Sequence, residues 1–320
     1  MKIVTFIKNW TLPISMVFGV LAYFVYVNIH ALDGTHQFMN RFVGIFQPLL
    51  IFCMLFLSFC RVRFKDLKLH GWQWLLLLMQ VGAFLLVSLP VILNPEIPHR
   101  ILYESAMICF ICPTATAAAV VTVKLHGNAN SVISYTCLIN LVASVLIPTM
   151  VSFLHSGTHD MDFFTSFTLI LSRVFPLLIM PLFLAFIIRK VAPRWHRWFE
   201  SVSNSAFYLW TICLALAIAI TTKALVHSHE TMGVYIGIAV VSAMCCVLQF
   251  VLGRRLGRHF GESISGAQSF GQKNTAFAIW MAYTFMNPVT SLAGGFYCIW
   301  HNVINSYQLW KERKVSLSEA

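Results

Sequence analysis

Long apolar runs, separated by short polar segments, follow one another along almost the whole chain. A helix needs about 20 predominantly apolar residues to cross the hydrocarbon core of a bilayer, and most of the runs have that length. The runs lie at 12–31, 42–60, 72–94, 101–123, 131–154, 163–188, 205–226, 232–252, 264–286 and 289–310. This pattern predicts an all-α integral membrane protein with ten transmembrane helices.

The fourth run contains a proline within a small and polar segment, 112–116, which reads Cys-Pro-Thr-Ala-Thr. Pro113 has no amide hydrogen and its ring clashes with the preceding helical turn. Backbone groups freed in this way must find partners inside the protein or line a cavity. Two interpretations are open: an ordinary proline kink, or a broken helix in which Thr114 and Thr116 offer hydroxyls to a cavity.

The ninth run is the most polar, because six of the ten residues in 266–275 carry polar side chains. Lys273 is the exceptional one, since insertion scales put the cost of a lysine at mid-membrane at about 2.5–3.5 kcal/mol. The segment is either an extramembrane loop or a second broken helix that faces a wet cavity. A loop would leave the tenth run without a partner crossing, which favours the broken helix.

The two interruptions lie about half a chain apart, since Thr116 and Asn274 are separated by 158 residues in a chain of 320. Interrupted helices at matching positions in two halves are typical of an inverted-repeat transporter with a binding site at the membrane midplane. We therefore expect one polytopic domain over 1–320, built from inverted five-helix repeats at about 10–156 and 160–312. The fourth and ninth helices are expected to be broken and to cross.

Composition and charge agree with a membrane chain. The sequence is 58% hydrophobic and only 10% charged, with a formal net charge of +11. Seventeen of the 22 Lys and Arg residues fall in the segments on one side of the predicted membrane, and three fall on the other. This positive-inside asymmetry predicts a multi-pass bacterial inner-membrane protein with both termini cytoplasmic, and no nucleic-acid partner. The sequence gives no indication of oligomeric state.

Three short motifs make the chain resemble the bile acid:sodium symporter family of bacterial ten-helix carriers, over nearly its whole length. They are the segment 112–116 followed by Gly127-Asn128, the pair Asn274-Thr275 three residues after Gly271, and Trp300-His301-Asn302 in the last run. The resemblance implies a core domain with two crossing broken helices that rocks against a smaller panel domain. It also implies a solute site at the crossing.

The resemblance assigns candidate site residues. Thr116, Asn274 and His301 match family positions that line the substrate cavity, and Gln80 matches a glutamine of a sodium site. We assign solute binding to Thr114, Thr116, Asn274, Thr275, His301 and Asn302, and an ion or coupling site to Gln80, Thr136, Ser269, Gln272 and Lys273. Thr and Asn side chains, together with half-helix amide dipoles, suit an anionic solute.

The chain departs from the family at the sodium sites. A family Ser-Asn pair reads Ala118-Ala119 here, and of the matching positions in the fifth run only Thr136 keeps an oxygen. Ser269 stands in place of a family glutamate, and Lys273 in place of a glutamine. Sodium is a hard cation that needs several oxygen ligands, and none of the eleven acidic residues falls at mid-membrane. Sodium coupling is therefore doubted, and no other cofactor or metal is expected.

Lys273 then has two open interpretations. In the first, the Lys273 ammonium replaces the bound cation electrostatically, and it either stays charged and attracts an anionic solute or titrates and couples transport to protons. In the second, Lys273 is a structural residue that caps carbonyls at the helix break.

We accordingly expect a secondary active transporter of an organic anion, either bile-acid-like or a small organic acid, that works by alternating access. Its partners are the small organic anion and the lipid bilayer. The alternatives are a sodium-independent facilitator, proton-linked or exchanging, and a transport-fold solute sensor. An enzyme is not expected, because the sequence has no Gly-x-Ser-x-Gly motif and no paired mid-membrane acids.

Overall fold

The computed structural model describes residues 11–62, 67–155 and 162–318. Within these ranges the chain is 87% helical, with thirteen α-helices, three short 3-10 helices and no strand. The all-α class predicted from the apolar runs is therefore confirmed.

The helices follow the predicted runs closely. In chain order they are α2 (Thr11–Asn28), η1 (His30–Thr35), α3 (His36–Cys60), α4 (Gly71–Leu93), α5 (Arg100–Ile111), α6 (Ala117–Lys124), α7 (Ala129–His155), α8 (Phe163–Val191), α9 (Pro193–Val202), η3 (Ser203–Ser205), α10 (Ala206–Val226), α11 (Met232–Arg258), α12 (Ser263–Gly271), α13 (Thr275–Phe285), η4 (Pro288–Thr290) and α14 (Ser291–Ser318).

Six of the described helices are long and apolar enough to cross a membrane by length and composition alone. The other four predicted runs miss this standard for physical reasons. Run four is divided into α5 and α6, and run nine into α12 and α13, so that each half is too short. Helix α14 is too polar in its middle, where it carries His301, Asn302 and Asn305, and α2 qualifies only as a shorter apolar helix, Pro13–Asn28.

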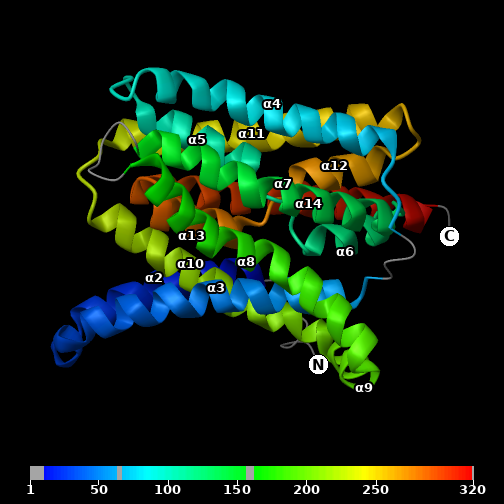
Figure 1. The fold of residues 1–320 in the computed structure, drawn as a ribbon, viewed down its shortest axis with the longest axis horizontal. Helices are drawn as coiled ribbons and strands as arrows, with labels where there is room; N and C mark the ends of the chain where they lie inside the picture. The colour runs from blue at the N-terminus through cyan, green and yellow to red at the C-terminus, as the bar shows by residue number, and fades with distance from the viewer. Residues whose placement is uncertain (1–10, 63–66, 156–161, 319–320) are drawn as a thin grey trace.

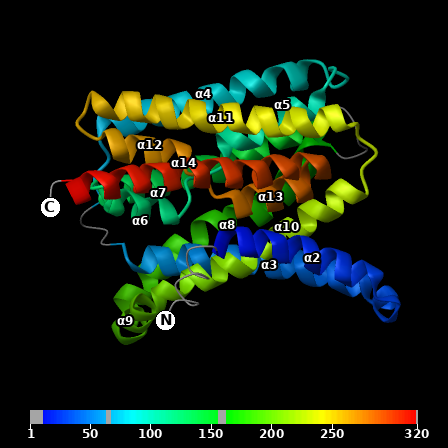
Figure 2. The same ribbon diagram turned by 180° about the vertical axis from the view of Figure 1, so that it is seen from behind.

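The long helices lie roughly side by side along the long axis of the molecule (Figures 1 and 2). Helices α4, α5 and α11 form one side, α2 and α3 form the opposite side, and α13 and α14 lie between them. Helix α10 packs on α2, α3 and α13, and α8 packs on both α7 and α3. Helices α12 and α13 of the second broken run are almost fully buried inside the bundle.

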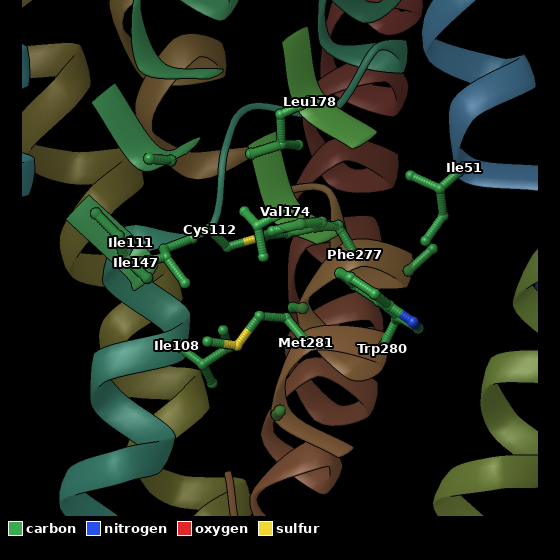
Figure 3. Close-up of a cluster of buried hydrophobic side chains, with 14 of the residues drawn as sticks. Ile51, Ile108, Ile111, Cys112, Ile147, Val174, Leu178, Phe277, Trp280 and Met281 are labelled. Carbon is green, nitrogen blue, oxygen red and sulfur yellow. The ribbon is translucent and has the colours of Figure 1, made fainter. Parts of the chain in front are cut away.

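An apolar cluster packs α13 against the helices around it (Figure 3). Its members include Ile51 of α3, Ile108 of α5, Val174 of α8, and Phe277 and Met281 of α13, all buried. In Figure 3, Met281 points toward Ile108 and Phe277 toward Val174 and Cys112, whereas Trp280 lies on the side of Ile51. Hence the middle of α13 is held by apolar contacts on both flanks.

Helix α9 was not predicted, because the segment 193–202 was interpreted as part of a basic connection between two membrane runs. Pro193 at the first helical position suits a helix start, since a proline there forfeits no intrahelical hydrogen bond. The helix is short and amphipathic, and it packs on α8 and α3.

Candidate functional site

The two broken helices meet backbone to backbone at their interruptions. The amide of Ala115 donates to the carbonyl of Gln272 at 2.8 Å, and the amide of Asn274 donates to the carbonyl of Pro113 at 2.8 Å. Thr114 and Lys273 form an antiparallel bridge between these two bonds. Segment 112–116 is thus a full interruption rather than a proline kink, and its backbone is paired with that of the ninth run.

Side chains satisfy most of the remaining carbonyls at the crossing. The Thr114 hydroxyl donates to the carbonyl of Ser269 at 2.6 Å, the Tyr297 hydroxyl donates to that of Gly271 at 2.8 Å, and the Cys112 thiol lies 2.9 Å from that of Asn274. Because a lipid environment offers no water to unpaired carbonyls, these contacts allow two helices to end inside the molecule.

Lys273 and Gln80 converge on the C-terminal end of α5. The ammonium Nζ of Lys273 donates to the carbonyl of Phe110 at 3.3 Å and lies 5.2 Å from the ring centre of Phe270. The Gln80 amide donates to the same carbonyl at 2.8 Å and to that of Cys112 at 3.2 Å. The end of a helix carries partial negative charge, which favours a cation there. Lys273 is buried at this helix end, with 1% of its surface exposed.

A cavity of about 400 Å³ lies next to the crossing, toward the end of the molecule that carries α9 and the last turns of α14 (Figures 1 and 2). One wall comes from the broken helices and α14, and the other from α3, η3 and α10. Its lining residues are Met54, Leu55, Ser58, Arg61, Ala115, Thr116, Ala117, Val120, Val121, Ser203, Ala206, Phe207, Trp210, Gln272, Lys273, Asn274, Thr275, Ala276, His301, Asn302, Asn305, Ser306 and Leu309.

Two helix N-termini border this cavity, those of α6 at Ala117 and of α13 at Thr275. The first amides of a helix have no intrahelical acceptor and carry partial positive charge. The Asn274 side chain caps α13 by accepting from the amide of Phe277 at 3.2 Å. Thr116, by contrast, makes no side-chain bond to the first turn of α6. The α6 terminus is therefore the less satisfied of the two, and it suits an anionic group.

Several polar side chains at the cavity are buried without a protein partner. These atoms are Nδ1 of His301, Oε1 of Gln272 and Nδ2 of Asn305. A buried polar atom without a hydrogen bond is costly, so such atoms commonly await a ligand or water. Asn302 differs, because its side-chain amide donates to the carbonyl of Cys298 at 2.7 Å within its own helix.

The charge around the cavity is positive or neutral. Among the described residues that line it there is no Asp or Glu, whereas Arg61 and Lys273 both belong to the lining. The Arg61 Nε donates to the hydroxyl of Ser203 at 2.5 Å, which fixes the guanidinium at the junction of α3 and η3. An anionic solute would meet no repelling carboxylate there.

The structure divides the sequence-assigned residues into two places. Thr116, Asn274, Thr275, His301, Asn302, Gln272 and Lys273 line the cavity. Thr114, Gln80, Thr136 and Ser269 do not; they are buried in the helix packing behind it. The Thr136 hydroxyl donates to the carbonyl of Val132 at 2.8 Å, so its hydrogen is used within α7.

Sequence reasoning missed Arg61, Asn305 and Trp210, which also line the cavity. Asn305 could have been predicted from the sequence, because it follows His301 by four residues and so shares its helix face. Arg61 directly follows run two and Trp210 belongs to run seven, and only the packing of α3 and α10 against the crossing brings them to the site.

Comparison with known proteins identifies the family to which the chain belongs. No curated protein matches the sequence at a significant level. A family model matches residues 9–303, which is nearly the whole chain, and that family is described as the SBF-like CPA transporter family. The match covers both broken helices and the Trp300-His301-Asn302 motif, so the resemblance predicted from those motifs is confirmed. The chain therefore belongs to the SBF-like CPA transporter family.

Proposed function

We propose that the protein is a secondary transporter that carries an organic anion across the membrane by alternating access. The observation that supports this best is the cavity at the crossing, where two half-helix N-termini and several unpartnered polar atoms meet and no described lining residue is a carboxylate. Membership of a transporter family agrees with it. The solute would place its anionic group near Thr116 and its apolar part against side chains such as Leu55 and Trp210.

The proposed architecture is a single domain over 1–320 with ten membrane crossings in two inverted repeats. Helices α5–α6 and α12–α13 each act as one broken crossing, because each pair together has about the length that a membrane needs. Helices α4 to α7 and α11 to α14 make up the core domain. Helices α2, α3, α8 and α10 make up the panel, and both termini are cytoplasmic in an inner membrane.

Two cavities at opposite ends of α13 and α10 support alternating access. The main cavity lies at their first turns, near Ala276 and Ala206. A second cavity of about 480 Å³ lies at their other ends, lined by residues that include Lys223, His227 and Tyr283. Between the two, Phe277 and Met281 are buried in the apolar cluster of Figure 3. A rocking motion that parts this cluster and closes the first cavity would expose the solute to the opposite side.

We propose further that transport does not use sodium. The Lys273 Nζ donates to the carbonyl of Phe110, and Gln80 donates to the same oxygen. The Gln80 amide oxygen accepts the Tyr135 hydroxyl at 2.7 Å, so it is also engaged. With Ala118 and Ala119 offering no side-chain oxygen, the region has few ligands left for a hard cation.

Uptake of a labelled bile acid and of a set of small organic acids into proteoliposomes tests the proposal. Imposed sodium and potassium gradients are compared across pH. We expect saturable uptake that a sodium gradient does not stimulate. Sodium-stimulated uptake would contradict the proposal that transport does not use sodium, but it would still support the proposal that the protein is a carrier. Tight solute binding without flux would instead identify a solute sensor.

The variants Lys273→Met and Lys273→Arg test whether the Lys273 ammonium substitutes for a coupling ion or only caps carbonyls at the helix break. Lys273→Met leaves the α5 end without a cation, so we expect uptake to be lost, whereas Lys273→Arg should keep at least part of it. Gel filtration and thermal unfolding in detergent check that both variants fold. Normal uptake by folded Lys273→Met at every pH would show that the ammonium does not substitute for a coupling ion.

A further inference from the structure

Helix α9 presents two exposed tryptophans on one face. Trp195 is 63% exposed and Trp198 is 53% exposed, and their rings meet edge to face with centroids 6.1 Å apart. Residues three apart lie on the same side of a helix, so the two indoles form one aromatic surface. Tryptophan is enriched where a bilayer meets water, because its ring is apolar and its N–H is polar.

The adjacent face of α9 is attached to the rest of the protein. His196 is buried, and the ring of Phe199 packs edge-on against Phe56 of α3 with centroids 4.9 Å apart. Helix α9 therefore cannot turn its tryptophans inward without losing this packing, and the aromatic surface stays directed away from the bundle.

A basic strip runs beside the aromatic surface. Arg194 and Arg197 are exposed, and the last turn of the preceding helix α8 carries Arg189 and Lys190. Glu200 is the single acidic residue of α9. The arginine guanidinium forms paired hydrogen bonds with phosphate oxygens, so exposed arginines beside interfacial tryptophans suit phospholipid headgroups.

We propose that α9 lies in the bilayer interface and binds anionic phospholipid headgroups. Arg194 and Arg197 would hold the phosphates, while Trp195 and Trp198 would sit at the boundary between headgroups and acyl chains. The excess of basic over acidic residues selects an anionic lipid over a zwitterionic one. This inference does not rest on the transport proposal, since it concerns the outer surface and not the cavity.

The site is also connected to the mouth of the cavity. Helix α9 continues into η3, where the hydroxyl of Ser203 accepts from Arg61 and donates to the carbonyl of Glu200. Both Arg61 and Ser203 line the cavity. A lipid bound to α9 is therefore anchored within about two helical turns of the cavity wall that η3 provides.

Quenching of tryptophan fluorescence by brominated lipids tests this site in the full-length protein. The protein is reconstituted in bilayers that contain either brominated phosphatidylglycerol or brominated phosphatidylcholine at equal amounts. Subtracting the fluorescence of the variant Trp195→Phe/Trp198→Phe from that of the wild type leaves the emission of the two α9 tryptophans. We expect the anionic lipid to quench the α9 signal more strongly than the zwitterionic lipid does.

Arginine variants show whether charge causes the preference. Arg194→Gln/Arg197→Gln should abolish it, and Arg194→Lys/Arg197→Lys should retain it. Arg254→Gln/Arg255→Gln, an exposed pair on α11, a helix that contains no tryptophan, should leave it unchanged. The proposal would be overturned if both lipids quenched the wild type equally, or if Arg194→Gln/Arg197→Gln kept the preference for the anionic lipid. It would also be overturned if Arg254→Gln/Arg255→Gln lost that preference to the same extent.

Discussion

Thr114 and Thr116 lie two residues apart, yet they face different surroundings. The Thr114 hydroxyl is fully buried and donates to the carbonyl of Ser269, behind the cavity. Thr116 lines the cavity and makes no capping bond to α6. Of these two threonines, Thr114 thus holds the crossing together and Thr116 lines the cavity.

Valine substitutions at these two positions should therefore separate stability from binding. Thr114→Val leaves the carbonyl of Ser269 unpaired, so we expect the free energy of unfolding to fall by about 1–3 kcal/mol. Thr116→Val should leave unfolding nearly unchanged and raise KM for the solute roughly 3- to 10-fold, the value of one hydrogen bond. Thermal unfolding in detergent and concentration-dependent uptake measure the two effects. Similar behaviour of both variants would contradict the division.

At the scale of elements, α11 and α12 approach each other closely, and glycines make the approach possible. A Cβ added at Gly253 would lie 2.4 Å from the carbonyl oxygen of Gly266, and one at Gly257 would lie 2.3 Å from that of Glu262. Small residues that let backbones approach are common between membrane helices. This pair holds α12, and with it the ninth-run break, in register with α5.

Gly253→Ala should therefore destabilise the protein. The added methyl group meets backbone rather than a movable side chain, and we expect a loss of about 1–3 kcal/mol in unfolding free energy. Gly82→Ala on α4 is the matched control, because nothing lies within 4 Å of its added Cβ. That control should be neutral or slightly stabilising, since alanine favours a helix over glycine. Equal unfolding temperatures of both variants would show that α11 and α12 can separate without cost.

At the scale of the whole molecule, the two cavities lie at opposite ends of the contact between α10 and α13. The cavity at the crossing includes Arg61 and Ser203, which belong to the end where the sequence concentrates its basic residues. If that end is cytoplasmic, as the charge asymmetry predicts, the structure has its solute site open to the cytoplasm.

Cysteine labelling tests this orientation. Thr116→Cys should react with a membrane-impermeant thiol reagent in inside-out vesicles and not in right-side-out vesicles, and solute should slow the reaction. His229→Cys, exposed at the other end, should show the reverse pattern. The native cysteines among the described residues are buried or half-buried, which keeps their background low. Labelling of Thr116→Cys from the outside alone would invert the predicted topology.

The sequence by itself determined the helices and the two breaks. Apolar length locates a membrane helix, because a backbone in lipid must satisfy its own hydrogen bonds. Pro113 and the polar segment around Lys273 marked the interruptions, because those residues are costly in an unbroken membrane helix. Helix α9 escaped this reasoning, since it is too short to give an apolar run and its amphipathic face is visible only once a helix is assumed.

Only the tertiary structure decided what the breaks do. Pairing of Ala115 with Gln272 and of Asn274 with Pro113 joins residues about 160 positions apart, and no local pattern specifies such a partner. The structure also placed the ammonium of Lys273 on the carbonyl of Phe110, and Arg61 and Asn305 at the cavity. Helix propensity and hydropathy are local properties, whereas the meeting of side chains depends on how the helices pack against one another.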